Sequence, residues 1–127
     1  MYLDPEFGDA MASWDRVMHA LSAGPRRQLI VALLDAPPER QLPLPDTALV
    51  PAVSQDPSSF SIELRHSHLP HLADAGYIRW SDDPFAVQRG PRFDEPAAVV
   101  RLLLQGRRDL PASLWNDAIE SNLPDRL

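Results

Sequence analysis

The chain of 127 residues contains neither cysteine nor lysine, so its twelve Lys-or-Arg positions are all arginines. Without cysteine it can form no disulfide and no thiolate metal site. Its longest apolar run, Leu29–Leu34, is far shorter than the ~20 residues that a membrane-spanning helix requires. The first ten residues are acidic and lack the basic and apolar blocks of a signal peptide. We therefore predict a cytoplasmic protein that does not contact membranes.

Sequence motifs of the common enzyme classes are missing as well. Five glycines in the whole chain leave little material for a loop that holds nucleotide phosphates. The chain has no nucleophile elbow around a serine and no HExxH zinc-binding helix. We expect a protein that is not an enzyme and that uses no cofactor.

The chain is acidic, with 18 Asp and Glu against 12 Arg and a net charge of −6. This balance argues against a simple polyanion binder, because phosphate contacts normally come from a basic surface. The charge is uneven, however: residues 58–92 carry four acids and four arginines, and three of the four histidines. Acidity without lysine fits a halophilic or GC-rich source. High salt shrinks the electrostatic contribution to DNA binding, so acidity would weaken that binding less there.

Apolar residues at helical spacing predict two helices in the first third of the chain. The first covers residues 10–22, and one apolar stripe consists of Trp14, Val17, Met18 and Leu21. The second covers Arg26–Asp35, where Pro25 suits its first turn. Prolines then exclude regular structure over residues 36–45, and Pro51 interrupts a short third helix predicted at Asp46–Val53.

A longer fourth helix is predicted from Ser58 or Ser59, either of which can cap it, to Ala75. Pro70 lies inside this helix and should kink its axis, because proline has no N–H for the carbonyl four residues earlier. Gly76 suits the left-handed position that ends a helix. The apolar side chains that we expect to share one face are Ile62, Leu69, Leu72 and Ala73.

A β-hairpin follows the fourth helix at once, with strands at Tyr77–Trp80 and Phe85–Arg89. Further helical patterns cover Ala97–Gln105 and Pro111–Asn122. The order predicts a mainly helical α+β protein, namely a winged helix-turn-helix with a two-stranded wing and extra C-terminal helices. We assign residues 1–92 to the winged-helix domain and residues 93–127 to a C-terminal helical extension.

In a winged helix, the second helix of the turn pair presents its N-terminal half to the DNA major groove. Serine hydroxyls bond phosphates or base edges, and arginine reads guanine through two hydrogen bonds. Arginines in or beside the wing would contact the DNA backbone or the minor groove. The predicted DNA-binding residues are therefore Ser58, Ser59, Ser61, Arg65, Arg79, Arg89 and Arg92. The plain alternative is that each of them is a solvated surface residue.

Three clustered histidines, His66, His68 and His71, raise the question of a zinc site. On a helix His68 and His71 share a face, but His66 points elsewhere, and the sequence offers no nearby fourth ligand. We expect no metal here and favour histidines that pack or form hydrogen bonds around the kink. Their protonation near neutral pH could still change the charge of this region.

The C-terminal helices are apolar on more than one side, as the run from Val99 to Leu104 shows. Such a helix buries one face against its own domain and another against a further surface, often a second subunit. We therefore expect residues 93–127 to form a homodimer. The alternative is that the last helix folds back over the first. Core or interface packing is the expected role of Trp14, Trp80 and Trp115.

Two segments together resemble a known group, the winged-helix domains of halophilic archaea related to the ArsR-type regulators. The first is a Leu-Ser-x-x-Pro-Arg-Arg opening, here at Leu21, Ser22, Pro25, Arg26 and Arg27. The second is the His-x-His-Leu-Pro-x-Leu-x-x-Ala-Gly segment, here at His66, His68, Leu69, Pro70, Leu72, Ala75 and Gly76. The resemblance covers about residues 14–90, and it implies a winged helix that acts in transcriptional regulation.

Two hypotheses follow. The first is a homodimeric transcriptional regulator that inserts the helix at residues 58–75 into the major groove of double-stranded DNA. Its two reading helices would lie about 34 Å apart. The second is a protein–protein interaction module that kept this fold and lost DNA binding. The −6 net charge and the interruption by Pro51 favour the second hypothesis.

Overall fold

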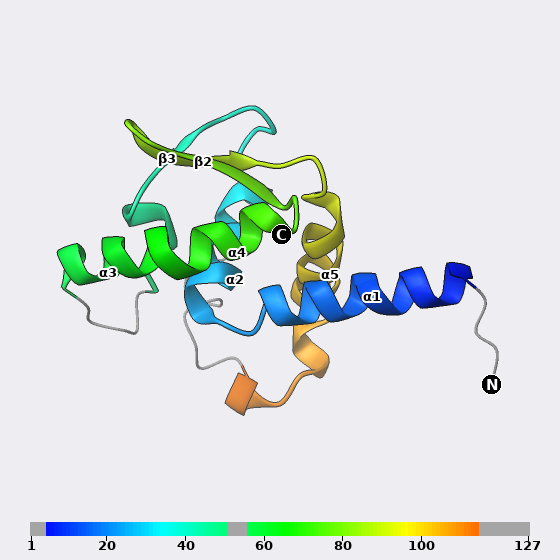
Figure 1. Cartoon of the computed structure of the whole chain (residues 1–127). Helices are drawn as coiled ribbons and strands as arrows, with labels where there is room; N and C mark the ends of the chain where they lie inside the picture. The colour runs from blue at the N-terminus through cyan, green and yellow to red at the C-terminus, as the bar shows by residue number, and fades with distance from the viewer. Residues whose placement is uncertain (1–4, 51–55, 115–127) are drawn as a thin grey trace.

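The computed structural model describes residues 5–50 and 56–114, and these form an α+β fold (Figure 1). Helices pack with a three-stranded antiparallel sheet. In chain order the elements are α1 (Pro5–Ala20), α2 (Gly24–Asp35), β1 (Leu42–Pro43), the 3-10 turn η1 (Asp46–Ala48), α3 (Pro57–Glu63), the π-helical segment η2 (Leu64–His68), α4 (Leu69–Asp74), β2 (Ile78–Asp82), β3 (Phe85–Arg89), α5 (Asp94–Gln105) and the 3-10 turns η3 (Arg107–Asp109) and η4 (Ala112–Leu114). Within these residues no helix has both the length and the apolar character to span a membrane.

Helix α2 is buried in the hydrophobic core. Its side chains Leu29, Ile30 and Leu33 are at most 1% exposed, and burial of each stabilises the fold by roughly 1.5–3 kcal/mol. The predicted second helix is thus confirmed, with Pro25 in its first turn. Every other layer contributes to the same core, through Val17, Phe60, Leu64, Leu69, Leu72, Tyr77, Ile78, Val87, Ala97, Val100 and Leu104. Residues 94–105 therefore pack as part of one hydrophobic unit with the elements before them.

Helix α1 is longer than predicted, and half of its predicted stripe is not in the core. Val17 and Leu21 are buried, but Trp14 and Met18 are 55% and 50% exposed. The reason is visible in Figure 1, where the N-terminal half of α1 runs past α5 and away from the body of the protein. Only the C-terminal turns of α1 therefore meet the core. Of the two roles expected for Trp14, core or interface packing, the first is excluded, and Met18 does not share the buried face of Val17 and Leu21.

Residues 57–74 form one continuous helix, which confirms the predicted fourth helix. Its cap is Asp56, whose carboxylate accepts a hydrogen bond from the Ser59 N–H at 3.1 Å. The prediction that Ser58 or Ser59 caps this helix is wrong, because Pro57 already occupies the first turn. At the other end Gly76 has a φ of +82°, the left-handed conformation predicted for it.

A π turn in the middle of this helix decides which side chains reach the core. Leu69 donates its N–H to the carbonyl of Leu64, five residues earlier, so both leucines remain buried. A kink was expected at Pro70. The structure has the π turn directly ahead of that proline. Before the π turn the buried residue is Phe60, whereas Ile62 is 58% exposed. The prediction that Ile62 faces the core is wrong because it assumed unbroken α-helical spacing.

The predicted hairpin is confirmed, and a third strand joins it. Strands β2 and β3 pair antiparallel with Trp80 opposite Val87, and β1 pairs with the other edge of β3. The strand order is therefore β1-β3-β2. β1 comes from the proline-rich segment that was predicted to be irregular. Two residues of strand fit there because Pro43 is on the edge of the sheet, where a missing N–H costs little.

The predicted third helix and the predicted last helix are not regular helices in the part that the structure describes. Only Asp46–Ala48 of the third forms a 3-10 turn, and residues 51–55 lie outside the described ranges. Helix α5 confirms the pattern at Ala97–Gln105. Of the helix predicted at residues 111–122, Ala112–Leu114 form a 3-10 turn, while Trp115 and the residues after it lie outside the described part.

The end of α4 and the end of β3 are locked together through their backbones at Gly90. Its N–H donates to the carbonyl of Tyr77 at 2.9 Å, and the Arg92 N–H donates to the carbonyl of Gly76 at 2.7 Å. A Cβ on Gly90 would lie 2.6 Å from the Gly76 carbonyl oxygen and 2.7 Å from the Ile78 nitrogen. The backbone of residues 76–78 therefore leaves no room for a side chain on Gly90.

We predict that Gly90→Ala lowers the free energy of unfolding by about 2–3 kcal/mol, as overpacking against rigid backbone does. The control is Gly8→Ala in α1, where a Cβ would meet nothing within 4 Å. That change should raise the free energy of unfolding by about 0.5–1 kcal/mol through helix propensity. Urea denaturation followed by circular dichroism measures both. Similar effects of the two substitutions would contradict the close approach at Gly90.

Candidate nucleic-acid interface

The outer face of α3 carries the predicted reading residues. Ser58 and Ser59 are exposed and Ser61 is half-buried, all in the first turns after the Asp56 cap. Ile62 and His66 lie farther along and are also exposed. The face therefore offers hydroxyl groups, one imidazole and one apolar side chain. This set can contact base edges and a thymine methyl group.

Arg65 joins this helix to the hairpin. Its Nε donates to Asp82 Oδ1 at 2.8 Å, and its guanidinium lies over the Phe85 ring at 3.9 Å from the centroid. The ion pair is at the surface, with side chains 38% and 65% exposed. It is therefore worth at most about 1 kcal/mol, and the arginine can exchange this partner for another anion at small cost.

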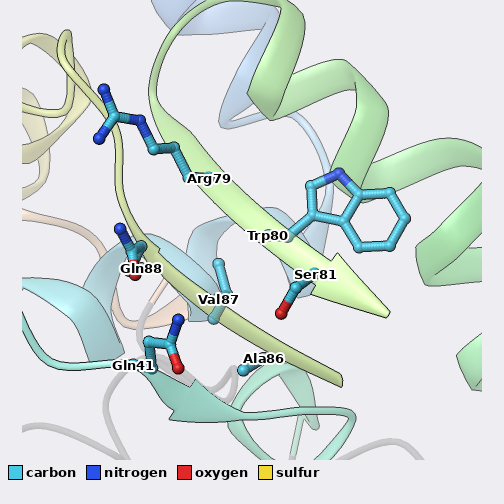
Figure 2. Close-up of a pocket in the computed structure, with 7 residues that line it drawn as sticks. All are labelled: Gln41, Arg79, Trp80, Ser81, Ala86, Val87 and Gln88. Atoms are coloured by element: carbon cyan, nitrogen blue, oxygen red, sulfur yellow. The ribbon is translucent and has the colours of Figure 1, made fainter. Parts of the chain in front are cut away.

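Arg79 lies on the solvent side of the hairpin, directly across from Gln88. Figure 2 shows Arg79 and Ser81 on one side of β2 and the indole of Trp80 on the other. The first two line a shallow depression of about 180 Å³, together with Gln41 and Gln88. Arg79 is exposed, so its guanidinium can reach a phosphate.

Arg89 is oriented inward and caps a helix. It donates from Nε to the Leu33 carbonyl at 3.1 Å, and from Nη2 to the carbonyls of Leu33, Leu34 and Ala36 at 2.9, 3.3 and 2.9 Å. Its guanidinium also lies 4.8 Å from the centroid of the Phe93 ring. These carbonyls lie at the end of α2. The Leu33 carbonyl also accepts from the Ala36 N–H at 3.3 Å, and Arg89 supplies a donor to the carbonyls of Leu34 and Ala36. The Nε and Nη2 donors of Arg89 are thus used inside the fold, which argues against the prediction that Arg89 contacts DNA.

Arg92 is exposed just after the hairpin, and its aliphatic stem lies beside Gly76. Its Nε is 3.8 Å from Glu95 Oε1, and a partly exposed ion pair of this kind contributes at most about 1 kcal/mol. Acidic side chains exposed near these arginines are Asp56, Glu63, Asp82 and Asp83. Two of the four predicted arginines, Arg79 and Arg92, are thus open to a ligand without first giving up a close hydrogen bond.

The three clustered histidines have different surroundings. His66 is exposed, while His68 is 7% exposed and His71 is half-buried. The His71 ring meets the His19 ring edge to face, with centroids 4.6 Å apart. Among residues 5–50 and 56–114 no group of three metal-ligating side chains comes together.

Burial lowers the pKa of His68 below its usual value, and it also lowers the pKa of His71. For His68 the nearby Glu63 carboxylate opposes the effect of burial, while the Arg26 guanidinium adds to it. For His71 both Arg26 and His19 add to it. Both histidines are therefore neutral at physiological pH.

Sequence reasoning missed Arg26. It is 8% exposed and bonds the carbonyls of His19 and Ala20 at 3.1 and 2.8 Å, which closes the end of α1. Its Nη1 reaches His68 Nδ1 at 3.1 Å. The signal available in the sequence was the Pro-Arg-Arg opening of α2, where an arginine in the first turn can reach back to the preceding helix end.

An apolar groove of about 340 Å³ lies between α1 and α5, and the sequence predicted only the part of it that α5 contributes. It is lined by Ala10, Ser13, Trp14, Val17, Glu95, Ala98, Val99 and Leu102. The prediction that α5 has two apolar faces agrees with it, because Val100 and Leu104 are buried while Leu102 is 66% exposed. Trp14 was expected to pack in the core or at an interface, but spacing along α1 alone does not show that it lines a groove with α5.

Comparisons with protein-family models, with curated proteins and with solved structures find no match to this chain.

The contrast between Arg89 and Arg79 can be tested through stability. We predict that Arg89→Met lowers the free energy of unfolding by about 2–3 kcal/mol, because it keeps the stem but removes the donor that the carbonyls of Leu34 and Ala36 use. Arg79 is exposed on the neighbouring strand β2, so Arg79→Met should change the free energy of unfolding by less than about 0.5 kcal/mol. Guanidinium chloride denaturation measures both. Equal effects would show that Arg89 does not cap α2.

Proposed function

We propose that this chain is a winged helix-turn-helix regulator that binds double-stranded DNA. The proposal rests on the order of elements: helix α2, the short edge strand β1, the turn η1, the long helix at residues 57–74, and the hairpin β2–β3. In this interpretation η1 is the remnant of the first helix of the turn pair, and the long helix reads DNA. The antiparallel order β1-β3-β2 supports it, since β2 and β3 form the wing.

The single observation that carries the proposal is the free outer face of α3 beside that wing. Ser58, Ser59 and Ile62 are exposed, although the helix is anchored from behind by Phe60, Leu64 and Leu69. Insertion into the DNA major groove requires a helix that is packed against its domain on one side and exposed to solvent on the other.

Arg65 is proposed to exchange Asp82 for the DNA. An exposed ion pair contributes at most about 1 kcal/mol, whereas an arginine with two hydrogen bonds to guanine discriminates by about 1–3 kcal/mol. The exchange is therefore favourable. Arg79 and Arg92 are proposed to contact phosphates. Because only two such contacts are expected, the affinity for DNA should be modest.

We further propose that the regulator is a homodimer that pairs through α1 and α5. Large apolar side chains on these helices are 47–66% exposed, namely Met11, Trp14, Met18, Leu102 and Leu103. Single exposed apolar residues are ordinary, but Trp14 and Leu102 line one apolar groove between α1 and α5, and such a groove suits an interface. The part of α1 that runs past α5 (Figure 1) gives a second copy a ridge to pack against.

A second candidate function is a protein-interaction module on the same fold. The observation that favours it is the charge beside α3, where exposed Asp56, Glu63, Asp82 and Asp83 outnumber the free arginines. Such a surface repels phosphates and suits a basic partner. This candidate predicts no DNA binding at any salt concentration.

DNA binding is tested by fluorescence anisotropy with mixed genomic DNA over a salt series. The wild-type affinity should fall as salt rises. Arg65→Ala should lower affinity about tenfold, as loss of a base contact does. Asp82→Asn should raise affinity about two- to fivefold, because it frees Arg65 and removes a negative charge.

The control is Asp83→Asn, which removes the same charge at the neighbouring exposed residue while leaving the Arg65–Asp82 pair. It should raise affinity less than Asp82→Asn does. No wild-type binding even at low salt would reject the regulator and favour the interaction module. Equal gains from the two asparagine variants would mean that release of Arg65 plays no part.

The proposed dimer is tested by light scattering of the full chain. Trp14→Glu or Leu102→Glu should shift the dimer to a monomer, because each places a charge on the groove between α1 and α5. Ile62→Glu is the matched control, since Ile62 is equally exposed but lies on α3. It should leave the dimer intact. A wild-type monomer, or dissociation by Ile62→Glu, would contradict this interface.

A further inference from the structure

The junction between α1 and α2 is joined to the long helix by an arginine–histidine contact that is almost completely buried. Arg26 and His68 are 8% and 7% exposed, and Arg26 Nη1 lies 3.1 Å from His68 Nδ1. The other donors of Arg26 bond the Ala20 and His19 carbonyls and the Ser22 hydroxyl. The guanidinium is thereby held in position at the end of α1 and can approach His68 from one direction only.

This geometry determines the protonation state of His68. A guanidinium only donates hydrogen bonds, so His68 Nδ1 must be the acceptor and carry no proton. The ring is therefore neutral, with its hydrogen on Nε2, which faces Glu63 Oε1 at 3.7 Å. A second proton could only bind Nδ1, and it would point at the guanidinium. The contact would then lose its hydrogen bond and bring two positive charges together in a nearly dry site.

We propose that the Arg26–His68 contact is a proton-sensitive link, which fastens the long helix to the α1–α2 junction while His68 is neutral and is released when His68 takes up a second proton. His68 lies in the π-helical segment, where helical hydrogen bonding is already irregular. Loss of the link therefore acts on the segment of the long helix in which the hydrogen bonding is irregular. The link itself does not depend on whether the chain binds DNA.

The charged groups around the link all belong to elements that meet there. Arg26 comes from α2, Glu63 from α3, and His71 from α4, where it packs on His19 of α1. Arg27 lies beside Arg26, and Asp74 acts on His71. Glu63 alone favours protonation of His68, but it is 47% exposed and its effect is smaller than that of burial.

The sign of the pH dependence follows from linkage. Burial lowers the pKa of folded His68 below the 6.5 of a free histidine, so the unfolded chain takes up the proton first as the pH falls. The contribution of His68 to stability is therefore complete above pH 6.5 and is lost as the pH falls below it, until folded His68 is itself protonated. Within that window the unfolding equilibrium constant rises up to about tenfold per pH unit.

The first test is urea unfolding of the full chain between pH 7.5 and pH 5. His68→Gln keeps an oxygen that can accept from Arg26 but cannot titrate, so it should remove the part of the pH dependence that His68 supplies. His66→Gln, an exposed histidine of the same π segment, is the matched control and should keep the wild-type pH dependence. The same pH dependence in wild type and His68→Gln would overturn the proposal.

The second test uses the wild-type chain, so it does not depend on whether a variant folds. Nitrogen NMR of the imidazoles distinguishes the two neutral forms of a histidine. We expect His68 to carry its hydrogen on Nε2 at pH 7.5 and to titrate below 6.5. Below that titration, amide hydrogen exchange in residues 64–69 should lose protection relative to intrinsic rates. A hydrogen on Nδ1 at pH 7.5 would refute the link.

Discussion

Helix α2 buries one face in the core, and the last carbonyls of the helix need donors from another element. Arg89 meets this demand from β3, with hydrogen bonds to the carbonyls of Leu33, Leu34 and Ala36. Because β3 is the central strand, the same arginine sets the distance of the whole sheet from α2. The close approach at Gly90 then places the end of α4 against the strand that Arg89 holds. The angle between the long helix and the hairpin depends on this chain of contacts.

The features that could be predicted from the sequence are those set by neighbours in the chain. Gly76 ends its helix because a left-handed residue is needed there, and the hairpin follows from two apolar runs around a turn. The π turn could not be predicted, since it depends on keeping both Leu64 and Leu69 in the core. Its omission is why Ile62 was assigned to the wrong face. The exposure of Trp14 likewise depends on where α5 crosses α1, which local spacing does not encode.

Arginine roles were the least predictable part of the candidate site, because one residue type serves two opposite purposes. A guanidinium that caps a helix end and one that binds phosphate look the same in sequence, and only the partner distinguishes them. Arg26 and Arg89 lie within reach of bare carbonyls and are used for the fold. Arg65 has a weak surface partner, and Arg79 is exposed. The count of four acids and four arginines in residues 58–92 therefore overstates the positive charge available to DNA.

This division of arginines sharpens the choice between the two candidate functions. If DNA is the ligand, an acidic chain with few free guanidinium groups must rely on contacts with base edges and on two copies acting together, since affinities of linked sites multiply. The dimer would then be a requirement of binding. Helix α1 carries the proposed dimer surface at one end and meets Arg26 at the other, and Arg26 meets His68 in the long helix. The side chain of Arg26 thus connects the end of α1 to the long helix. That connection would be present in an interaction module too, but there nothing would require the spacing of two reading helices to be held constant.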